Sequence, residues 1–325
     1  MKVMPIQKRE ISDSRIVFGC MGLGGDWNYD PYTHEQVTIA EKAIEAALET
    51  GITMFDHADI YKMGKAEAVF GEVMKTKPGL REQIVLQSKC GIRFTDGVLP
   101  QRYDFSKSHI LSSVDGILQR LGTDYLDVLL LHRPDPLMEP DEIAEAFQQL
   151  KASGKVRHFG VSNMTAAQMR YLQKSIEQPL VVNQLELHLS RLDWLDQGIL
   201  VNRAEGSSLN FDDGILQHCL MEDIQLQAWG PLSQGRFTGK SLEGASEPVK
   251  ATTALIAKMA QERETTPEAI LLGWLMKHPA KIQPVIGTSS AERVKACKDA
   301  VRQAELMSRE DWYALYTSAR GVRVP

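Results

Sequence analysis

Short apolar segments alternate with amphipathic segments along almost the whole chain, and this alternation restricts the fold more than any other feature. Eight segments are nearly continuous in apolar residues, as is typical of parallel strands covered on both faces. They are residues 15–19, 52–56, 84–89, 125–132, 156–161, 180–186, 224–229 and 282–286. Between them, apolar residues recur every three or four positions, as in Val37, Ala40, Ile44 and Ala47, which predicts amphipathic helices.

The number and size of these units favour a closed (β/α)8 barrel, the TIM barrel of the α/β class. Eight units in 325 residues average about forty residues each, and such a barrel typically needs about 250 residues. The remainder predicts an N-terminal hairpin strand at residues 5–12, an insertion at 187–214 and a C-terminal helix at 308–319. An open doubly wound sheet is the alternative, but residues 19–25 lack its GxGxxG pattern. No linker-like segment divides the chain, so we expect residues 1–325 to form one domain.

Composition excludes several classes of function. Lys and Arg number 37 against 42 Asp and Glu, so the net charge of −5 gives no electrostatic reason to bind nucleic acid or an anionic membrane. The four cysteines and the histidines show no metal-ligand spacing, so we expect no metal site. The N-terminus lacks the apolar region of a signal peptide, and no apolar run is long enough to span a bilayer. We expect a cytoplasmic protein.

Ionisable residues stand where several predicted strands end, and in such a barrel these ends form the active-site face. Asp56, Lys89 and His132 each end a strand, and Tyr61 follows Asp56 in the next loop. Reduction of a carbonyl needs a proton donor, and a phenol with a pKa near 10 is a weak acid at neutral pH. The Lys89 ammonium should lower that pKa, with Asp56 holding the ammonium in place. A neutral His132 could donate a hydrogen bond to the carbonyl oxygen.

Two other classes of function share these residues. A Schiff-base lyase would use Lys89 as a neutral nucleophile, which the neighbouring Asp56 disfavours. A regulatory subunit could keep the barrel and bind the cofactor as a sensor.

Several longer motifs carry a resemblance to a known family. They are residues 55–61 (FDHADIY), 88–90 (SKC), 131–136 (LHRPDP), 154–163 (GKVRHFGVSN), 182–186 (VNQLE), 229–232 (WGPL) and 287–289 (GTS). Over about residues 14–301 the sequence resembles the aldo-keto reductase superfamily, and most closely its bacterial cytosolic oxidoreductases. The resemblance implies a catalytic tetrad of Asp56, Tyr61, Lys89 and His132.

The same resemblance implies an extended NADP(H) cofactor across the strand ends. Ser162, Asn163 and Gln184 would hold the nicotinamide carboxamide, and Trp229 would stack on its ring. The loop after Trp229 would fold over the pyrophosphate, with Gly230, Pro231, Leu232, Gly235, Arg236 and Lys240. The segment Gly287, Thr288 and Ser289 would open a helix whose Arg293 binds the 2′-phosphate.

The substrate side is marked by aromatic residues. Trp27, Tyr29 and Phe94 could wall an apolar pocket for an aldehyde or ketone. The resemblance also implies a small-molecule carbonyl substrate and a monomeric protein.

Overall fold

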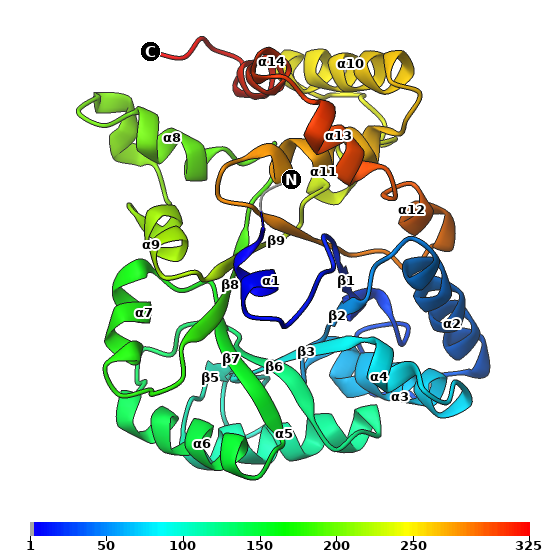
Figure 1. Ribbon diagram of the computed structural model, residues 1–325, viewed down its shortest axis with the longest axis vertical. Coiled ribbons are helices and arrows are strands. Elements are labelled where there is room, and N and C mark those ends of the chain that lie inside the picture. The colour runs from blue at the N-terminus through cyan, green and yellow to red at the C-terminus, as the bar shows by residue number, and fades with distance from the viewer. Residues whose placement is uncertain (1–2) are drawn as a thin grey trace.

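The computed structural model describes residues 3–325 and contains a closed barrel of eight parallel strands surrounded by helices (Figure 1). The barrel strands are β1 (Val17–Gly19), β2 (Met54–Asp56), β3 (Val85–Cys90), β6 (Leu126–Leu131), β7 (Val156–Ser162), β8 (Leu180–Glu186), β9 (Gln225–Trp229) and β10 (Gln283–Ile286). Neighbours in this order pair in parallel, and β10 pairs with β1 to close the barrel. All eight predicted strands and the TIM-barrel fold are confirmed.

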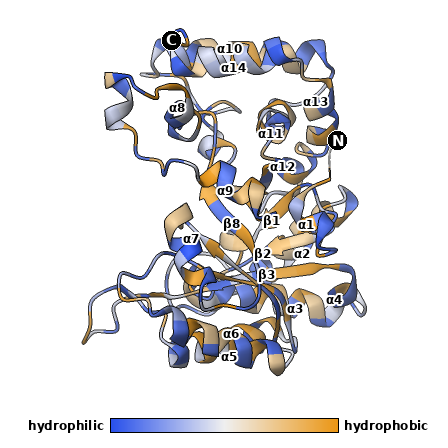
Figure 2. Cartoon of the chain, turned by 60° about the vertical axis from the view of Figure 1, so that its left-hand side comes forward, coloured by the Kyte–Doolittle hydropathy of each residue, from blue (hydrophilic) through white to orange (hydrophobic). Residues whose placement is uncertain are grey.

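Helices connect the strands and cover the barrel. They are α2 (His34–Glu49), α3 (Lys65–Thr76), α4 (Leu80–Gln83), α5 (Lys107–Leu121), α6 (Pro140–Ala152), α7 (Ala166–Gln173), α9 (Ile215–Met221), α10 (Glu247–Glu262), α11 (Pro267–Lys277), α12 (Ala291–Lys295) and α13 (Ala300–Leu306). In α2, a capping box of Thr33 and Gln36 begins the helix, and Ala40, Ile44 and Ala47 turn to the core. Figure 2 shows the result, with apolar strands inside and polar helix surfaces outside.

The predicted N-terminal hairpin strand at residues 5–12 is wrong. The segment instead forms the single helical turn α1 (Pro5–Lys8), with Pro5 at its first position. This turn lies over the centre of the barrel in Figure 1, and Met4 and Ile6 are fully buried against barrel residues such as Met54. Pro5 suits the first position of a helix, where its missing N–H needs no partner, and the Gln7 side chain accepts a hydrogen bond from the Met4 backbone N–H at 2.9 Å.

The insertion and the C-terminal helix both appear near their predicted positions. Residues 187–214 contain α8 (Asp193–Ile199) and the turn Ala204–Ser208. The final helix, α14 (Arg309–Arg320), begins at the predicted cap Ser308 and lies beside α10 in Figure 1. Its Trp312 ring stacks on Trp274 of α11 with centroids 5.2 Å apart. An antiparallel pair that was not predicted, β4 (Ile92–Arg93) and β5 (Arg102–Tyr103), follows β3.

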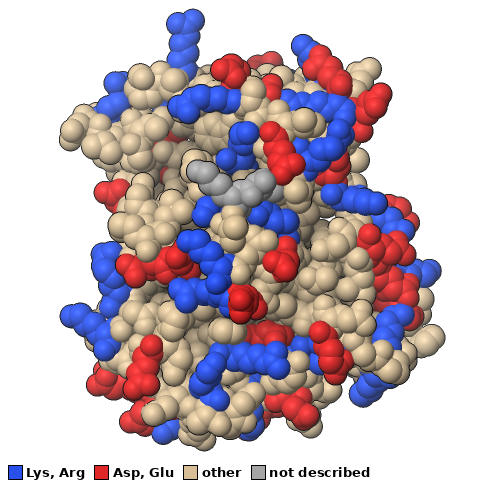
Figure 3. Space-filling model, in the orientation of Figure 1, with Lys and Arg blue, Asp and Glu red and all other residues tan. Residues whose placement is uncertain are grey.

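Charged side chains of both signs are interspersed over the face seen in Figure 3. Among residues 3–325, no helix has the length and apolarity needed to cross a membrane. The same residues contain no cluster of three or more His, Cys, Asp or Glu side chains arranged to hold a metal ion.

Candidate active site

Three adjacent strands bring the predicted tetrad together at one end of the barrel. Asp56 is the last residue of β2, Lys89 lies near the end of β3, and His132 directly follows β6. Strand β3 pairs with both β2 and β6, so these three positions are neighbours around the barrel rim. Tyr61 reaches the same place from the loop after β2, and all four residues meet as the sequence predicts.

Lys89 is the centre of this group. Its side chain is fully buried, and its Nζ donates hydrogen bonds to Asp56 Oδ2 at 2.6 Å and to the His57 carbonyl oxygen at 2.9 Å. The third donor reaches the Tyr61 hydroxyl at 3.2 Å. The rings of Tyr61 and His132 lie edge to face with centroids 5.9 Å apart. The phenol and the imidazole therefore converge on one point, beside a fully coordinated ammonium.

The surroundings of Lys89 keep it charged. Burial alone would lower the pKa of its ammonium, but the carboxylate of Asp56 and the hydroxyl of Tyr61 raise it, and the net pKa lies above its ordinary value. A charged ammonium has no lone pair to attack a carbonyl carbon. The site thus lacks the neutral lysine that a Schiff-base mechanism needs.

The imidazole of His132 is held neutral. Burial lowers its pKa well below the ordinary value, and the positive charges of Lys89 and Arg133 lower it further. Its Nδ1 is buried and has no hydrogen-bond partner among residues 3–325. A neutral imidazole carries one N–H that can donate to a substrate oxygen.

The expected lowering of the Tyr61 pKa is wrong for the protein without cofactor. Burial raises the pKa of the phenol, and this outweighs the opposing effect of the Lys89 ammonium. Asp56 also raises the pKa, because its negative charge disfavours a nearby phenolate. Tyr61 is therefore a fully protonated donor at neutral pH. The Lys89 ammonium offsets only part of the free-energy cost of burying the Tyr61 phenolate.

A layer of glutamines lies beneath the tetrad, and of its members the sequence analysis singled out only Gln184. Gln87 Nε2 donates to Asp56 Oδ1 at 2.6 Å and contacts Gln227 Oε1 at 2.8 Å. Gln227 Oε1 also accepts from Gln184 at 3.0 Å, and its Nε2 donates to Gln283 at 3.0 Å. The chain of amides links the carboxylate of the tetrad to the predicted nicotinamide site. Polar residues inside otherwise apolar strands were the signal available in the sequence.

The residues predicted to hold the nicotinamide lie on the next three strands. Ser162 Oγ donates to the Gln184 carbonyl oxygen at 2.9 Å, and Asn163 Nδ2 contacts Ser162 Oγ at 2.8 Å. Trp229 Nε1 donates to Asn163 Oδ1 at 3.1 Å. Asn163 adopts a left-handed backbone with φ of 57°, which is uncommon outside glycine. Amide groups and an indole are thus brought together beside His132, whose carbonyl oxygen accepts from Asn163 at 3.3 Å.

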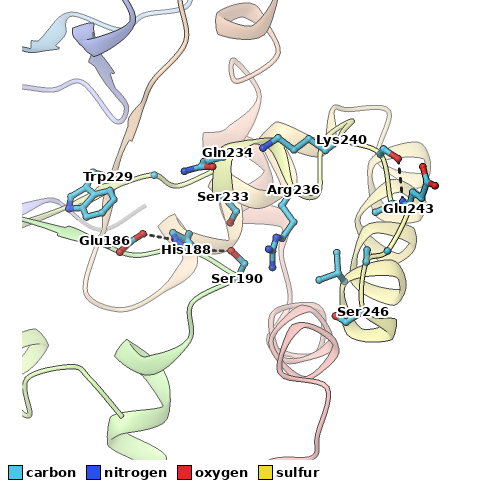
Figure 4. Close-up of a pocket in the computed structure, with 16 residues that line it drawn as sticks. Glu186, His188, Ser190, Trp229, Ser233, Gln234, Arg236, Lys240, Glu243 and Ser246 are labelled. Carbon is cyan, nitrogen blue, oxygen red and sulfur yellow. Dashed lines mark hydrogen bonds and ion pairs between the residues drawn. The ribbon is translucent and has the colours of Figure 1, made fainter. Parts of the chain in front are cut away.

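A cavity of about 750 Å³ continues outward from Trp229 (Figure 4). Of the predicted cofactor residues, it is lined by Trp229, Gly230, Arg236 and Lys240. Pro231, Leu232 and Gly235 belong to the same loop but do not line the cavity. Within residues 3–325, neither Arg236 nor Lys240 forms an ion pair, and the buried Ser233 Oγ has no hydrogen-bond partner. Two free cations and an unsatisfied hydroxyl fit the phosphates of an extended dinucleotide.

The cavity wall also contains a polar chain that the sequence did not reveal. His188 Nδ1 lies 3.0 Å from Ser190 Oγ, and its Nε2 lies 3.2 Å from Glu186 Oε1 (Figure 4). Arg191 forms an ion pair with the other oxygen of Glu186. Burial lowers the pKa of His188 despite the carboxylate of Glu186, so the ring is neutral at pH 7.

The predicted phosphate helix after β10 begins one residue later than expected. The cap of α12 is Ser290, whose Oγ accepts from the Arg293 backbone N–H at 3.4 Å, and Gly287, Thr288 and Ser289 precede it as a loop. One of the backbone N–H groups that could bind a phosphate at this helix start is thus already hydrogen-bonded to the cap residue. Arg293 is exposed, and these residues do not line the cavity.

The structure brings two of the three predicted substrate-pocket aromatics together. The rings of Trp27 and Phe94 lie edge to face with centroids 6.3 Å apart. Tyr29 is 80% exposed and makes no ring contact among the described residues. Trp27 and Phe94 thus pack on each other, and the role of Trp27, Tyr29 and Phe94 as the wall of a substrate pocket stays a prediction.

Known proteins match this chain over nearly its whole length. The model of the aldo/keto reductase family matches residues 15–315. The chain is 37% identical to the uncharacterized oxidoreductase YcsN of Bacillus subtilis, over 97% of each chain. It is 36% identical to a 6-dehydroglucose reductase of Agrobacterium fabrum, over 98% of this chain and 100% of that protein. An aldo-keto reductase of Klebsiella pneumoniae, solved in complex with NADPH, has a TM-score of 0.70 and 26% identity, covering 93% and 89% of the two chains.

Proposed function

The chain belongs to the aldo/keto reductase family and is an NADP-dependent oxidoreductase, and we propose that it reduces aldehydes or ketones to alcohols with Tyr61 as proton donor. The observation that carries this proposal is the Tyr61 hydroxyl, 3.2 Å from the buried ammonium of Lys89 and beside the neutral ring of His132. A carbonyl oxygen placed between phenol and imidazole would receive two hydrogen bonds.

Each residue of the tetrad has one role in this proposal. Tyr61 gives its proton to the oxygen of the substrate as negative charge develops there. His132 donates a hydrogen bond to the same oxygen and stabilises that charge. Lys89 compensates the phenolate that remains, and Asp56 holds Lys89 in position. Bound NADPH would supply the hydride, with its nicotinamide held by Ser162, Asn163, Gln184 and Trp229.

The charge on Lys89 argues against the lyase alternative. A carboxylate at 2.6 Å, a carbonyl oxygen and a phenol occupy all three of its N–H donors. An ammonium in this environment serves as a fixed positive charge, and its deprotonation would leave Asp56 as a buried, unpaired anion.

Turnover separates the reductase from a cofactor-sensing subunit. A panel of aldehydes and ketones with NADPH at pH 7 should show loss of NADPH absorbance. Tyr61→Phe should lower the rate 10²–10⁴-fold, the usual cost of removing a general acid, and leave NADPH affinity within a few-fold. Tyr171→Phe changes a half-exposed tyrosine on α7 and is the matched control. If Tyr61→Phe keeps more than about a tenth of the wild-type rate, Tyr61 is not the donor.

A further inference from the structure

Two cations directly follow the two residues that would contact the carbonyl oxygen. Lys62 follows Tyr61, and Arg133 follows His132. Both side chains are half-buried, and across residues 3–325 neither forms a hydrogen bond or an ion pair. Partly buried cations are normally paired, because removing a charge from water without a partner is costly. Two unpaired cations that directly follow Tyr61 and His132 are therefore candidates for pairing with an anionic ligand.

Each cation lies against an indole ring instead of a carboxylate. The Arg133 guanidinium carbon is 5.9 Å from the centre of the Trp229 ring, and Lys62 Nζ is 5.3 Å from that of Trp27. A cation–π contact holds a cation in place without neutralising it. Trp229 belongs to the proposed nicotinamide site and Trp27 to the aromatic wall of the substrate side. The two positive charges are thus positioned at the mouth of the barrel and stay available to a ligand.

Four acidic side chains on or after the barrel strands are engaged by other partners. Asp56 pairs with Lys89, Glu186 with Arg191, and Asp104 with Arg93, while Asp135 accepts from the backbone N–H groups of Phe105 and Leu137. None of these four carboxylates pairs with Lys62 or Arg133, so both cations keep their charge in a chain that carries −5 overall.

The backbone at Lys62 is a second, independent observation. Lys62 and Met63 have φ of 52° and 59°, and Gly64 has φ of 86°, so three successive residues are left-handed. This conformation costs free energy at residues other than glycine, and such strain gathers at functional sites. At this strained position directly after Tyr61, the ammonium of Lys62 lies over the Trp27 ring.

Resting on the proposed function, we propose that the preferred substrates are aldehydes or ketones carrying an anionic oxygen group, a carboxylate or a phosphate ester, bound by Arg133 with support from Lys62. The planar guanidinium can donate two parallel hydrogen bonds to either group. Binding would satisfy the two free cations and would hold the carbonyl between Tyr61 and His132. Neutral aldehydes would still react, but without this anchor.

Matched substrate pairs test the proposal with the enzyme and NADPH. Succinic semialdehyde is compared with its methyl ester, and glyceraldehyde 3-phosphate with glyceraldehyde, as ratios of kcat/KM. In wild type, at least one anionic partner should be favoured roughly tenfold or more, as a charged hydrogen bond allows. Arg133→Met should reduce that ratio about tenfold, and Arg133→Lys should restore part of it. Arg170→Met removes the same charge from the exposed face of α7 and should leave the ratio as in wild type.

The outcomes distinguish this inference from the function it rests on. Whichever pair shows the preference identifies carboxylate or phosphate as the bound group. Ratios near one in wild type, with neutral aldehydes turned over, overturn the inference and leave the reductase standing. If Arg133→Met lowers kcat/KM equally for the anionic and the neutral substrate of a pair and also weakens NADPH binding, Arg133 contacts the cofactor and the inference is overturned. No turnover of any aldehyde, with NADPH bound, refutes the proposed reductase and the inference with it.

Discussion

Asp59→Asn should stabilise the protein above neutral pH and leave its stability unchanged in acid. Asp59 lies in the loop between Asp56 and Tyr61, and its Oδ1 is buried without a hydrogen-bond partner among the described residues. It faces a cavity of about 240 Å³ that is also lined by Arg120. The Nε of Arg120 donates to Glu67 at 2.8 Å, so the guanidinium is engaged by the other carboxylate. Burial and the charge of Glu67 raise the pKa of Asp59 to about 7, against the opposing effect of Arg120.

The magnitude follows from this pKa and that of the unfolded chain. With a carboxyl pKa of 3.8 unfolded and about 7 folded, the difference of about 3 units corresponds to at most ~4 kcal/mol. Because the folded pKa is the higher one, the folded state binds more protons between these values, and stability falls as pH rises from about 4 to 7. The penalty is absent below the unfolded pKa and complete above pH 7. An amide at position 59 cannot ionise and removes it.

The assay is denaturant unfolding of wild type and Asp59→Asn at pH 4 and pH 8.5. The variant should gain up to ~4 kcal/mol at pH 8.5 and little at pH 4. Asp299→Asn is a control of opposite sign, since hydrogen bonds from Arg302 lower the Asp299 pKa to about 2. That variant should lose about 1–2 kcal/mol at pH 8.5, after screening by solvent, and the loss should shrink as pH falls below 4. Equal stability of wild type and Asp59→Asn at both pH values would refute a buried, protonated Asp59.

Three further predictions concern the site. NADPH should quench tryptophan fluorescence through Trp229, and Trp229→Leu should lose most of the quench; an undiminished quench would point to Trp27 instead. NADPH should bind more tightly than NADH, and Arg293→Ala should reduce the ratio of the two dissociation constants roughly tenfold. Equal dissociation constants in wild type would exclude a contact with the 2′-phosphate. Because burial raises the pKa of Tyr61, the reduction rate should stay flat to about pH 9, and Lys89→Met should lose most activity; a rate that falls from pH 7 upward would contradict the protonated donor.

The barrel and the tetrad were predictable because each depends on a regular relation between sequence and space. Parallel strands covered on both faces must be apolar throughout, so the eight segments stand out from the amphipathic helices. In a parallel barrel, all carboxyl ends meet on one face, so Asp56, Lys89 and His132 were expected to converge before any distance was known. The hydrogen bonds of Lys89 to Asp56 and Tyr61, and the contact between the Tyr61 and His132 rings, confirm that convergence.

Features that depend on the competition between neighbouring effects were not predictable. The pKa of Tyr61 is one example. The sequence predicts that Lys89 is near, but the extent of burial decides whether the pKa rises or falls, and burial depends on the packing of the folded chain. The start of α12 is another, since Ser289 and Ser290 are both good caps in the sequence and the structure uses Ser290.

Lys62 and Arg133 show how local charge departs from composition. A net charge of −5 gave no reason to expect binding to nucleic acid or an anionic membrane. In the folded chain, Asp56 pairs with Lys89 and Glu186 pairs with Arg191, and neither carboxylate pairs with Lys62 or Arg133. Pairing of this kind is decided by which loops meet at the barrel mouth, and it leaves two cations beside the reacting centre of an acidic protein. Substrate charge preference is therefore a property of the loop arrangement, which the overall balance of charged residues does not report.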